Sequence, residues 1–283
     1  MRIPDVRTAA RNPLVQFFGL VFVLSAPFWL LGYVAERADI GLPYQLPISA
    51  LQTVCPVLAA SIAVAHRDGP GAAARLCKQI LNRGRTGAGS WYLAAIFLMP
   101  LIMLLSYWVQ VTAGSPIPPP HIALLTVPVL FLVYLITAAC EELGWMGYAM
   151  PLMRRRGWGT TASSLTIGVI WAVWHYIPLL EAGRTPAWIA WWSLGTVAAR
   201  VIIVWLYNNA GASVLVAAVF HAMVNLTYSL FPVNGSYYNP AVAGVIEAAI
   251  AMVIIFMQEM RRRYLVRSPS AGPIIPVPPR SPA

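Results

Sequence analysis

The sequence predicts an all-α, polytopic transmembrane helical bundle of about eight spans. Hydrophobic residues make up 59% of the 283 residues and charged residues only 10%, a composition that excludes an ordinary soluble domain. The apolar residues also gather into runs of about 20, which is the length of a helix that crosses a bilayer. We therefore expect a multi-pass protein of the cell membrane, in contact with membrane lipids.

The spans can be placed from the apolar runs and from the Pro, Gly and Asn residues between them. In chain order we expect them at about residues 14–35, 47–66, 91–112, 122–150, 161–180, 187–207, 213–231 and 240–260. The first run is long enough to span and lacks a cleavage site, so it predicts a retained helix. A short interfacial helix is expected at 72–81, within a strongly basic loop.

The basic residues indicate topology rather than a nucleic-acid partner. The net charge is +10, but Lys and Arg occur in short blocks between spans and not along one polar face. With the amino terminus inside, nearly all of them fall on the inner side, and the outer loops keep only Arg37 and Arg184. The positive-inside bias therefore predicts that both termini are cytoplasmic.

Three parts of the chain can be distinguished. Residues 1–121 hold spans one to three and the basic cytoplasmic loop, and residues 122–260 hold a core of spans four to eight. Residues 261–283 are basic and Pro-rich, so we expect a disordered tail. The three cysteines are widely spaced and predict neither a disulfide framework nor a thiolate metal site.

The strongest functional signal is a pair of adjacent carboxylates, Glu141 and Glu142, at the end of an apolar run. A charge inside a membrane helix costs about 2.5 to 3.5 kcal/mol on insertion scales, so a pair needs a compensating reason. Two structural explanations are also open: the pair could be an ion-pair partner, or it could mark the end of the helix.

Two histidines add to this signal from other spans. His175 follows Trp171 by four residues and His221 precedes Asn225 by four, so each pair shares a helix face. A lone membrane histidine is more often structural. Because three such features occur in the second half of the chain, we expect these groups and the glutamates to surround one cavity.

These residues resemble the CPBP family of intramembrane proteases, also called the ABI or type II CAAX prenyl endopeptidase family. The family motifs EExxxR, FxxxH and HxxxN correspond here to 141–146, 171–175 and 221–225, and the resemblance covers about residues 127–228. There are two departures: Trp171 stands for the Phe, and Met146 stands for the Arg. We expect Trp171 to keep the packing role, and Arg200 of span six to supply the missing cation.

The resemblance implies peptide-bond hydrolysis of a membrane-associated peptide or protein by a glutamate-activated water. Glu141 would activate the water with help from His175, and Glu142 would tune or position it. His221 and Asn225 would face the developing oxyanion, where a preorganised donor is worth about 2.7 to 4 kcal/mol.

The sequence leaves other interpretations of these residues open. A zinc ion could be held by His175 and His221 with a glutamate and water, although no cofactor is required by the residues. Because Met146 replaces the motif arginine, activity could be reduced or lost, which would leave a silent scaffold. In a proton-coupled transporter, Glu141, Glu142 and His175 would instead form a relay.

Overall fold

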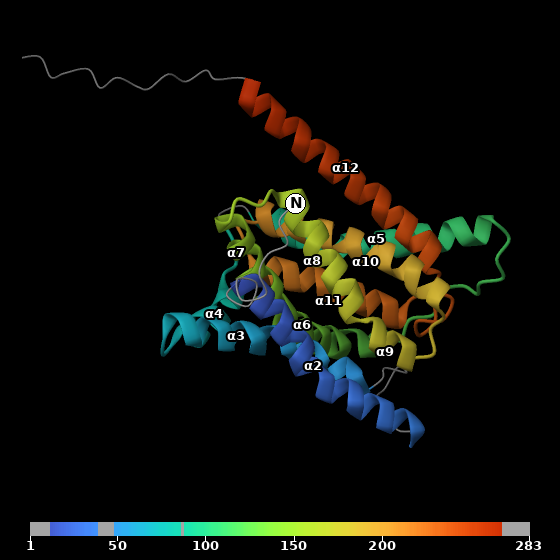
Figure 1. Ribbon diagram of the computed structural model, residues 1–283. Coiled ribbons are helices and arrows are strands. Elements are labelled where there is room, and N and C mark those ends of the chain that lie inside the picture. Colours follow the sequence, from blue (N-terminus) through green and yellow to red (C-terminus); the bar gives the residue numbers. More distant parts are fainter. Residues whose placement is uncertain (1–11, 39–47, 86–87, 268–283) are drawn as a thin grey trace, which may run out of the picture.

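The computed structural model describes residues 12–38, 48–85 and 88–267, and within these ranges it contains helices and no strand, as predicted. Figure 1 shows a helical bundle from which the last helix projects. The elements are α2 (Pro13–Arg37), η2 (Ile48–Val54), α3 (Cys55–Asp68), α4 (Ala72–Lys78), η3 (Gln79–Leu81), α5 (Gly89–Thr112), η4 (Leu124–Thr126), α6 (Val127–Gly144), η5 (Trp145–Ala149), α7 (Met150–Arg155), α8 (Thr160–Trp174), α9 (Tyr176–Glu181), α10 (Pro186–Asn209), α11 (Val214–Leu230) and α12 (Pro240–Arg267).

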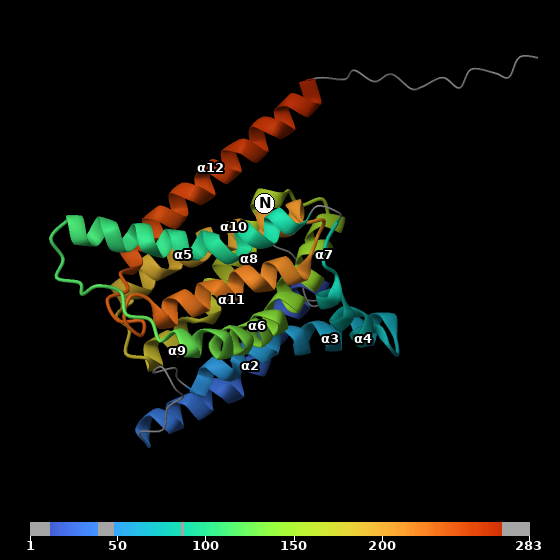
Figure 2. The ribbon, with the colours of Figure 1, turned by 180° about the vertical axis from the view of Figure 1, so that it is seen from behind.

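Seven of the helical segments in the described residues are long and apolar enough to cross a membrane. The expected seventh span, α11, has only 17 residues and falls short of that length. It lies inside the bundle, where it packs against α6, α5 and α10, and Figure 2 shows it between α5 and α6. A helix covered by protein does not have to match the thickness of the bilayer by itself, since its neighbours shield it from lipid.

Loop contacts show which loops share an end of the bundle. The Arg154 guanidinium donates to Asn208 Oδ1 at 2.6 Å, and Ser213 Oγ donates to the Asn82 carbonyl at 2.7 Å. The basic loop before α5, the end of α7, the end of α10 and the start of α11 therefore meet, as the predicted topology requires. Which side of the membrane they face stays a prediction, and the basic lead of residues 1–11 lies outside the described residues.

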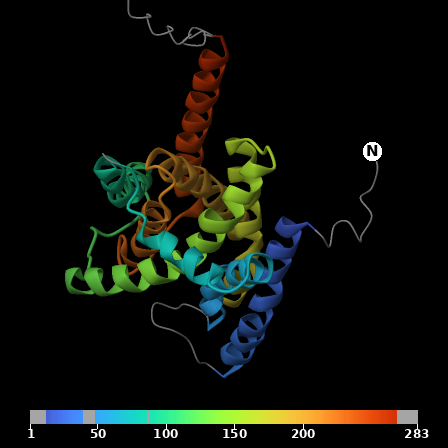
Figure 3. The same ribbon diagram turned by 90° about the vertical axis from the view of Figure 1, so that its left-hand side faces the viewer.

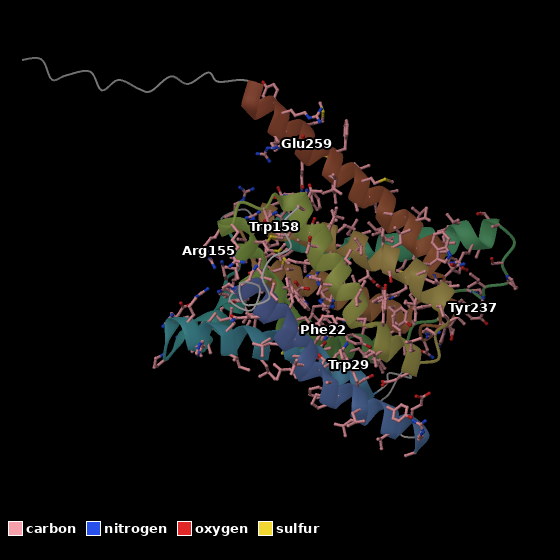
Figure 4. The ribbon with its side chains drawn as sticks, viewed as in Figure 1. Phe22, Trp29, Arg155, Trp158, Tyr237 and Glu259 are labelled. Atoms are coloured by element: carbon pink, nitrogen blue, oxygen red, sulfur yellow. The ribbon has the colours of Figure 1, made fainter. Side chains whose placement is uncertain are left out.

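The opposite end is formed by loops with few charges. There, Ser49 Oγ donates a hydrogen bond to Glu181, and Arg184 Nη2 donates to Tyr228 Oη at 3.3 Å. Figure 4 shows Tyr237 at this end and Arg155 at the basic end of the bundle.

The fourth span is a single segment from Leu124 to Arg155, longer than the expected 122–150, and its last third contains one π-helical stretch, Trp145–Ala149. The π-helical turn begins three residues after the glutamate pair, a place where such turns often mark function. Just before it, a Cβ added to Gly144 would lie 2.6 Å from Pro56 Cβ and 2.7 Å from the Pro56 carbonyl oxygen. Only glycine therefore lets α6 approach α3 this closely.

The fifth span was expected to be one helix over 161–180, but it is broken at His175 into α8 and α9. Pro178 explains the break, because it has no N–H for the carbonyl of Trp174, four residues earlier. The Trp174 carbonyl instead accepts a hydrogen bond from Gln52 Nε2 at 3.3 Å.

The last helix is longer than predicted. Residues 261–267 were expected to begin a disordered tail, yet α12 continues to Arg267. Glu259 explains the extension, since its carboxylate pairs with Arg262 and Arg263 one turn later. The remaining tail, 268–283, lies outside the described residues. Figure 3 shows how far the end of α12 projects from the other helices.

Candidate active site

One cavity of about 310 Å³ lies within the core of the bundle, and five of the predicted site residues line it. They come from three different helical segments, as the sequence predicted. These segments are α6, α8 with the break that follows it, and α11. The five are Glu141, Trp171, His175, His221 and Asn225. Most of the remaining lining is apolar, and this reduces the competition of water with polar groups inside.

Glu141 is the carboxylate of the pair that faces this cavity, and its side chain is almost fully buried, with 2% exposed. The Trp171 indole N–H donates to its Oε2 at 2.7 Å, and the Trp145 indole N–H approaches the same oxygen at 3.5 Å. Its Oε1 lies 4.0 Å from His221 Nε2. One carboxylate oxygen is therefore held by an indole, while the other is left for a ligand.

Glu142 is fully buried and does not line the cavity. Arg200 Nη1 donates to its two oxygens at 2.8 and 2.7 Å, and His221 Nδ1 donates to Oε1 at 2.9 Å. Successive residues of an α-helix point about 100° apart, so the two neighbouring acids enter different surroundings. One faces the cavity and the other is paired behind its wall.

Arg200 supplies a cation to the pair from α10. It is fully buried, its Cζ lies 4.0 Å from the centroid of the Trp171 ring, and it donates to Glu142. Met146, at the arginine position of the motif, is also fully buried and lies in the hydrophobic core. The positive charge thus reaches the carboxylate from another helix, as we expected from the sequence.

The hydrogen bonds of the two histidines fix their tautomers when each ring is neutral. His175 Nδ1 lies 2.7 Å from the Trp171 carbonyl, which can only accept, so Nδ1 carries the proton. His221 Nδ1 likewise faces the carboxylate of Glu142. In both neutral rings Nε2 is then a proton acceptor.

Asn225 lies half-buried one turn after His221 and lines the same cavity. In the part of the chain that the structure describes, its carboxamide makes no hydrogen bond. Its N–H groups are therefore available to a bound group.

The residues do not fit the zinc alternative. Across residues 12–38, 48–85 and 88–267, no group of three or more His, Cys, Asp or Glu side chains is placed to hold a metal ion. The metalloprotease expectation is therefore not supported, and no step of the chemistry below uses a metal.

Comparison with known proteins shows what this core is similar to. Residues 123–227 match the family model described as type II CAAX prenyl endopeptidase Rce1-like. This core segment is similar to type II CAAX prenyl endopeptidases. A relative named CAAX prenyl protease 2, from Methanococcus maripaludis, is 28% identical over 178 residues, which is 58% of this chain and 64% of the relative. The matched segment thus spans less than two thirds of that relative's length.

Sequence reasoning missed other polar groups that line the same cavity, namely Glu247 of α12, Arg184, Tyr228 and Tyr238. Glu247 had a signal, because it is an isolated acid within the apolar run of the last span. Arg184, Tyr228 and Tyr238 had none, since nothing in their local pattern shows which helix ends meet.

Proposed function

We propose that this protein belongs to the CPBP family and is an intramembrane endopeptidase of the cell membrane, which hydrolyses a peptide bond of a membrane-associated peptide or protein. The single observation that carries the proposal is the position of Glu141, a buried carboxylate that faces a largely apolar cavity beside two imidazoles. The name of the Methanococcus relative makes a prenylated CAAX peptide the first substrate to try.

In the proposed reaction, a water molecule lies between Glu141 and the scissile carbonyl. Trp171 holds Oε2 of the carboxylate, which leaves Oε1 to take the water proton while the water oxygen attacks the carbonyl carbon. His175, whose Nδ1–H is bound to a carbonyl, offers Nε2 as a second acceptor for this water. The C–N bond then breaks, and Glu141 returns its proton to the leaving amine.

The developing oxyanion would be stabilised by donors from α11. Asn225 has free amide N–H groups, and His221 can donate from Nε2 when both of its ring nitrogens carry protons. Glu142 would act indirectly, since it holds His221 at Nδ1 and neutralises Arg200. We therefore assign Glu142 and Arg200 positioning roles.

The deciding experiment compares wild-type protein with Glu141→Gln on a prenylated CAAX peptide and on a library of membrane peptides. Loss of a general base typically costs about 10²- to 10⁴-fold in rate, so Glu141→Gln should cut cleavage by that factor. Glu259→Gln is the matched control, since it removes an acid on the exposed part of α12. Equal cleavage by wild type and Glu141→Gln would exclude the proposal.

The two other interpretations, a silent scaffold and a transporter, predict different results. A silent scaffold would cleave nothing in either form, and a transporter would show proton-coupled uptake that depends on Glu141. The Arg200–Glu142 pair argues against the scaffold, since the missing motif arginine was its main support.

A further inference from the structure

A second buried acid, Glu247, lines the cavity from α12. Its side chain is 3% exposed, yet within the described residues it makes neither a hydrogen bond nor an ion pair. Glu142 and Glu141 both have such partners. A buried carboxylate without a partner is costly, so a cavity that retains one is suited to a ligand that supplies the partner.

The backbone around Glu247 leaves room for its carboxylate. A Cβ added to Gly195 of α10 would lie 3.2 Å from Glu247 Oε2 and 3.3 Å from Gly244 Cα. The two glycines let α10 and α12 approach closely, and the carboxylate occupies the space that a side chain on Gly195 would take. Its position is therefore fixed by the packing of two helices.

Aromatic side chains also line this cavity. Trp192, Tyr228 and Tyr238 line the cavity, and the rings of Tyr228 and Tyr238 meet edge to face with centroids 5.0 Å apart. The faces of such rings attract cations. A carboxylate and aromatic rings in one apolar cavity both favour a positively charged ligand.

One cation of the protein, Arg184, also lines this cavity. Its Nη2 donates to the Tyr228 hydroxyl at 3.3 Å, and its Cζ lies 4.9 Å from the ring centroid of Trp188. No ion pair joins it to Glu247 in the described part of the chain. Its charge is thus directed to tyrosine and tryptophan, and the carboxylate stays available.

We infer that Glu247 anchors a cation-binding subsite in this cavity, which takes a lysine or arginine side chain of the substrate peptide. The inference rests on the proposed function, because it treats the cavity as the place where the peptide binds. It adds a preference that neither the motifs nor the relative's name contains, namely a basic residue in the bound segment.

The test measures binding rather than cleavage. Short capped Ala–Leu peptides that differ at one position, with lysine in one and uncharged norleucine in the other, are titrated against the full-length protein in detergent, and cavity tryptophan fluorescence is followed. The position of the variable residue is scanned along the peptide. At the best position, lysine should bind about tenfold or more tightly than norleucine, since a hydrogen bond to a charged group is worth about 1.5 to 3 kcal/mol.

The same titration with Glu247→Gln should remove the lysine preference, because glutamine keeps the shape of the side chain and loses its charge. Glu259→Gln, on the projecting part of α12, should keep it (Figure 4). An arginine peptide should behave as the lysine peptide does.

Two results would overturn the inference: no lysine preference in wild type, including no binding at all, or a preference that survives Glu247→Gln. The wild-type comparison decides even if Glu247→Gln does not fold. Cleavage without a lysine preference would leave the protease proposal standing and remove the subsite. A lysine preference without any cleavage would leave the subsite standing and remove the protease proposal.

Discussion

The indole N–H of Trp171 donates a hydrogen bond to Glu141 Oε2 at 2.7 Å. The family motif has phenylalanine at this position, and a phenyl ring cannot make this bond. From the sequence we expected the exchange to preserve packing only. The structure shows that the larger ring also orients the carboxylate proposed to be the base, while its face lies against Arg200.

Trp171→Phe therefore tests whether this bond matters. The variant keeps an aromatic ring beside the imidazoles but removes the donor, so we expect a loss of about 1 to 2 kcal/mol in stability. The cleavage rate should fall by about tenfold, since Glu141 loses its orientation. Thermal unfolding in detergent and initial rates would measure the two effects.

Trp174→Phe is the matched control for that variant. Trp174 is also buried, and its indole N–H donates to Ser25 Oγ at 2.7 Å, away from Glu141. A similar loss of stability with a much smaller loss of rate is expected. If both variants lost activity equally, the Trp171 bond would have no special role.

Much of the fold was predictable because the spans are long, apolar and separated by polar or Pro-rich loops. Glu141, both histidines and Asn225 could be assigned to one cavity from their spacing and from the family resemblance. Glu142 was also expected there, but it lies behind the cavity wall. The different surroundings of Glu141 and Glu142 could not be predicted, because they depend on how α6 is rotated against α10. The break at His175 was predictable in principle from Pro178, but the partner of the freed carbonyl, Gln52, lies on a distant segment.

Removing one partner of the Arg200–Glu142 pair should cost more stability than replacing both partners. Arg200→Met leaves a buried carboxylate without its cation, and such losses cost about 3 to 5 kcal/mol. Combining Arg200→Met with Glu142→Gln should cost less than the sum of the two single variants. Unfolding of all four proteins in detergent gives this cycle, and simple additivity would show that the pair is not coupled.

Met146→Arg restores the family arginine and asks whether Arg200 already takes its place. In the wild type we expect destabilisation and no gain in activity, because a second cation would be buried in the core without a free carboxylate. In the Arg200→Met background the same change should recover part of the lost stability. If the Met146→Arg single variant were as stable as wild type and more active, Arg200 would not be taking the place of the motif arginine.

Asn225→Ala tests the proposed oxyanion role of this residue, which lines the cavity. Removing one preorganised donor costs about 2.7 to 4 kcal/mol in the transition state, so kcat should fall by about 10²- to 10³-fold with little change in KM. Asn209→Ala is the control, since the amide of Asn209 donates to the Trp205 carbonyl within its own helix, at 2.8 Å. A change in KM alone would assign Asn225 to substrate binding instead.

Gly144→Ala examines the contact that places the glutamate pair. The added methyl group would lie 2.6 Å from Pro56 Cβ and 2.7 Å from the Pro56 carbonyl oxygen, so α6 and α3 must separate. Overpacking of this kind costs about 1 to 3 kcal/mol, and here it also displaces the turn that carries Glu141 and Glu142. Gly19→Ala on α2 meets nothing within 4 Å and should leave stability unchanged or slightly raised. Because the clash is with backbone, no rotamer change can relieve it, and a Gly144→Ala protein with wild-type stability and activity would mean that α6 and α3 do not pack this closely.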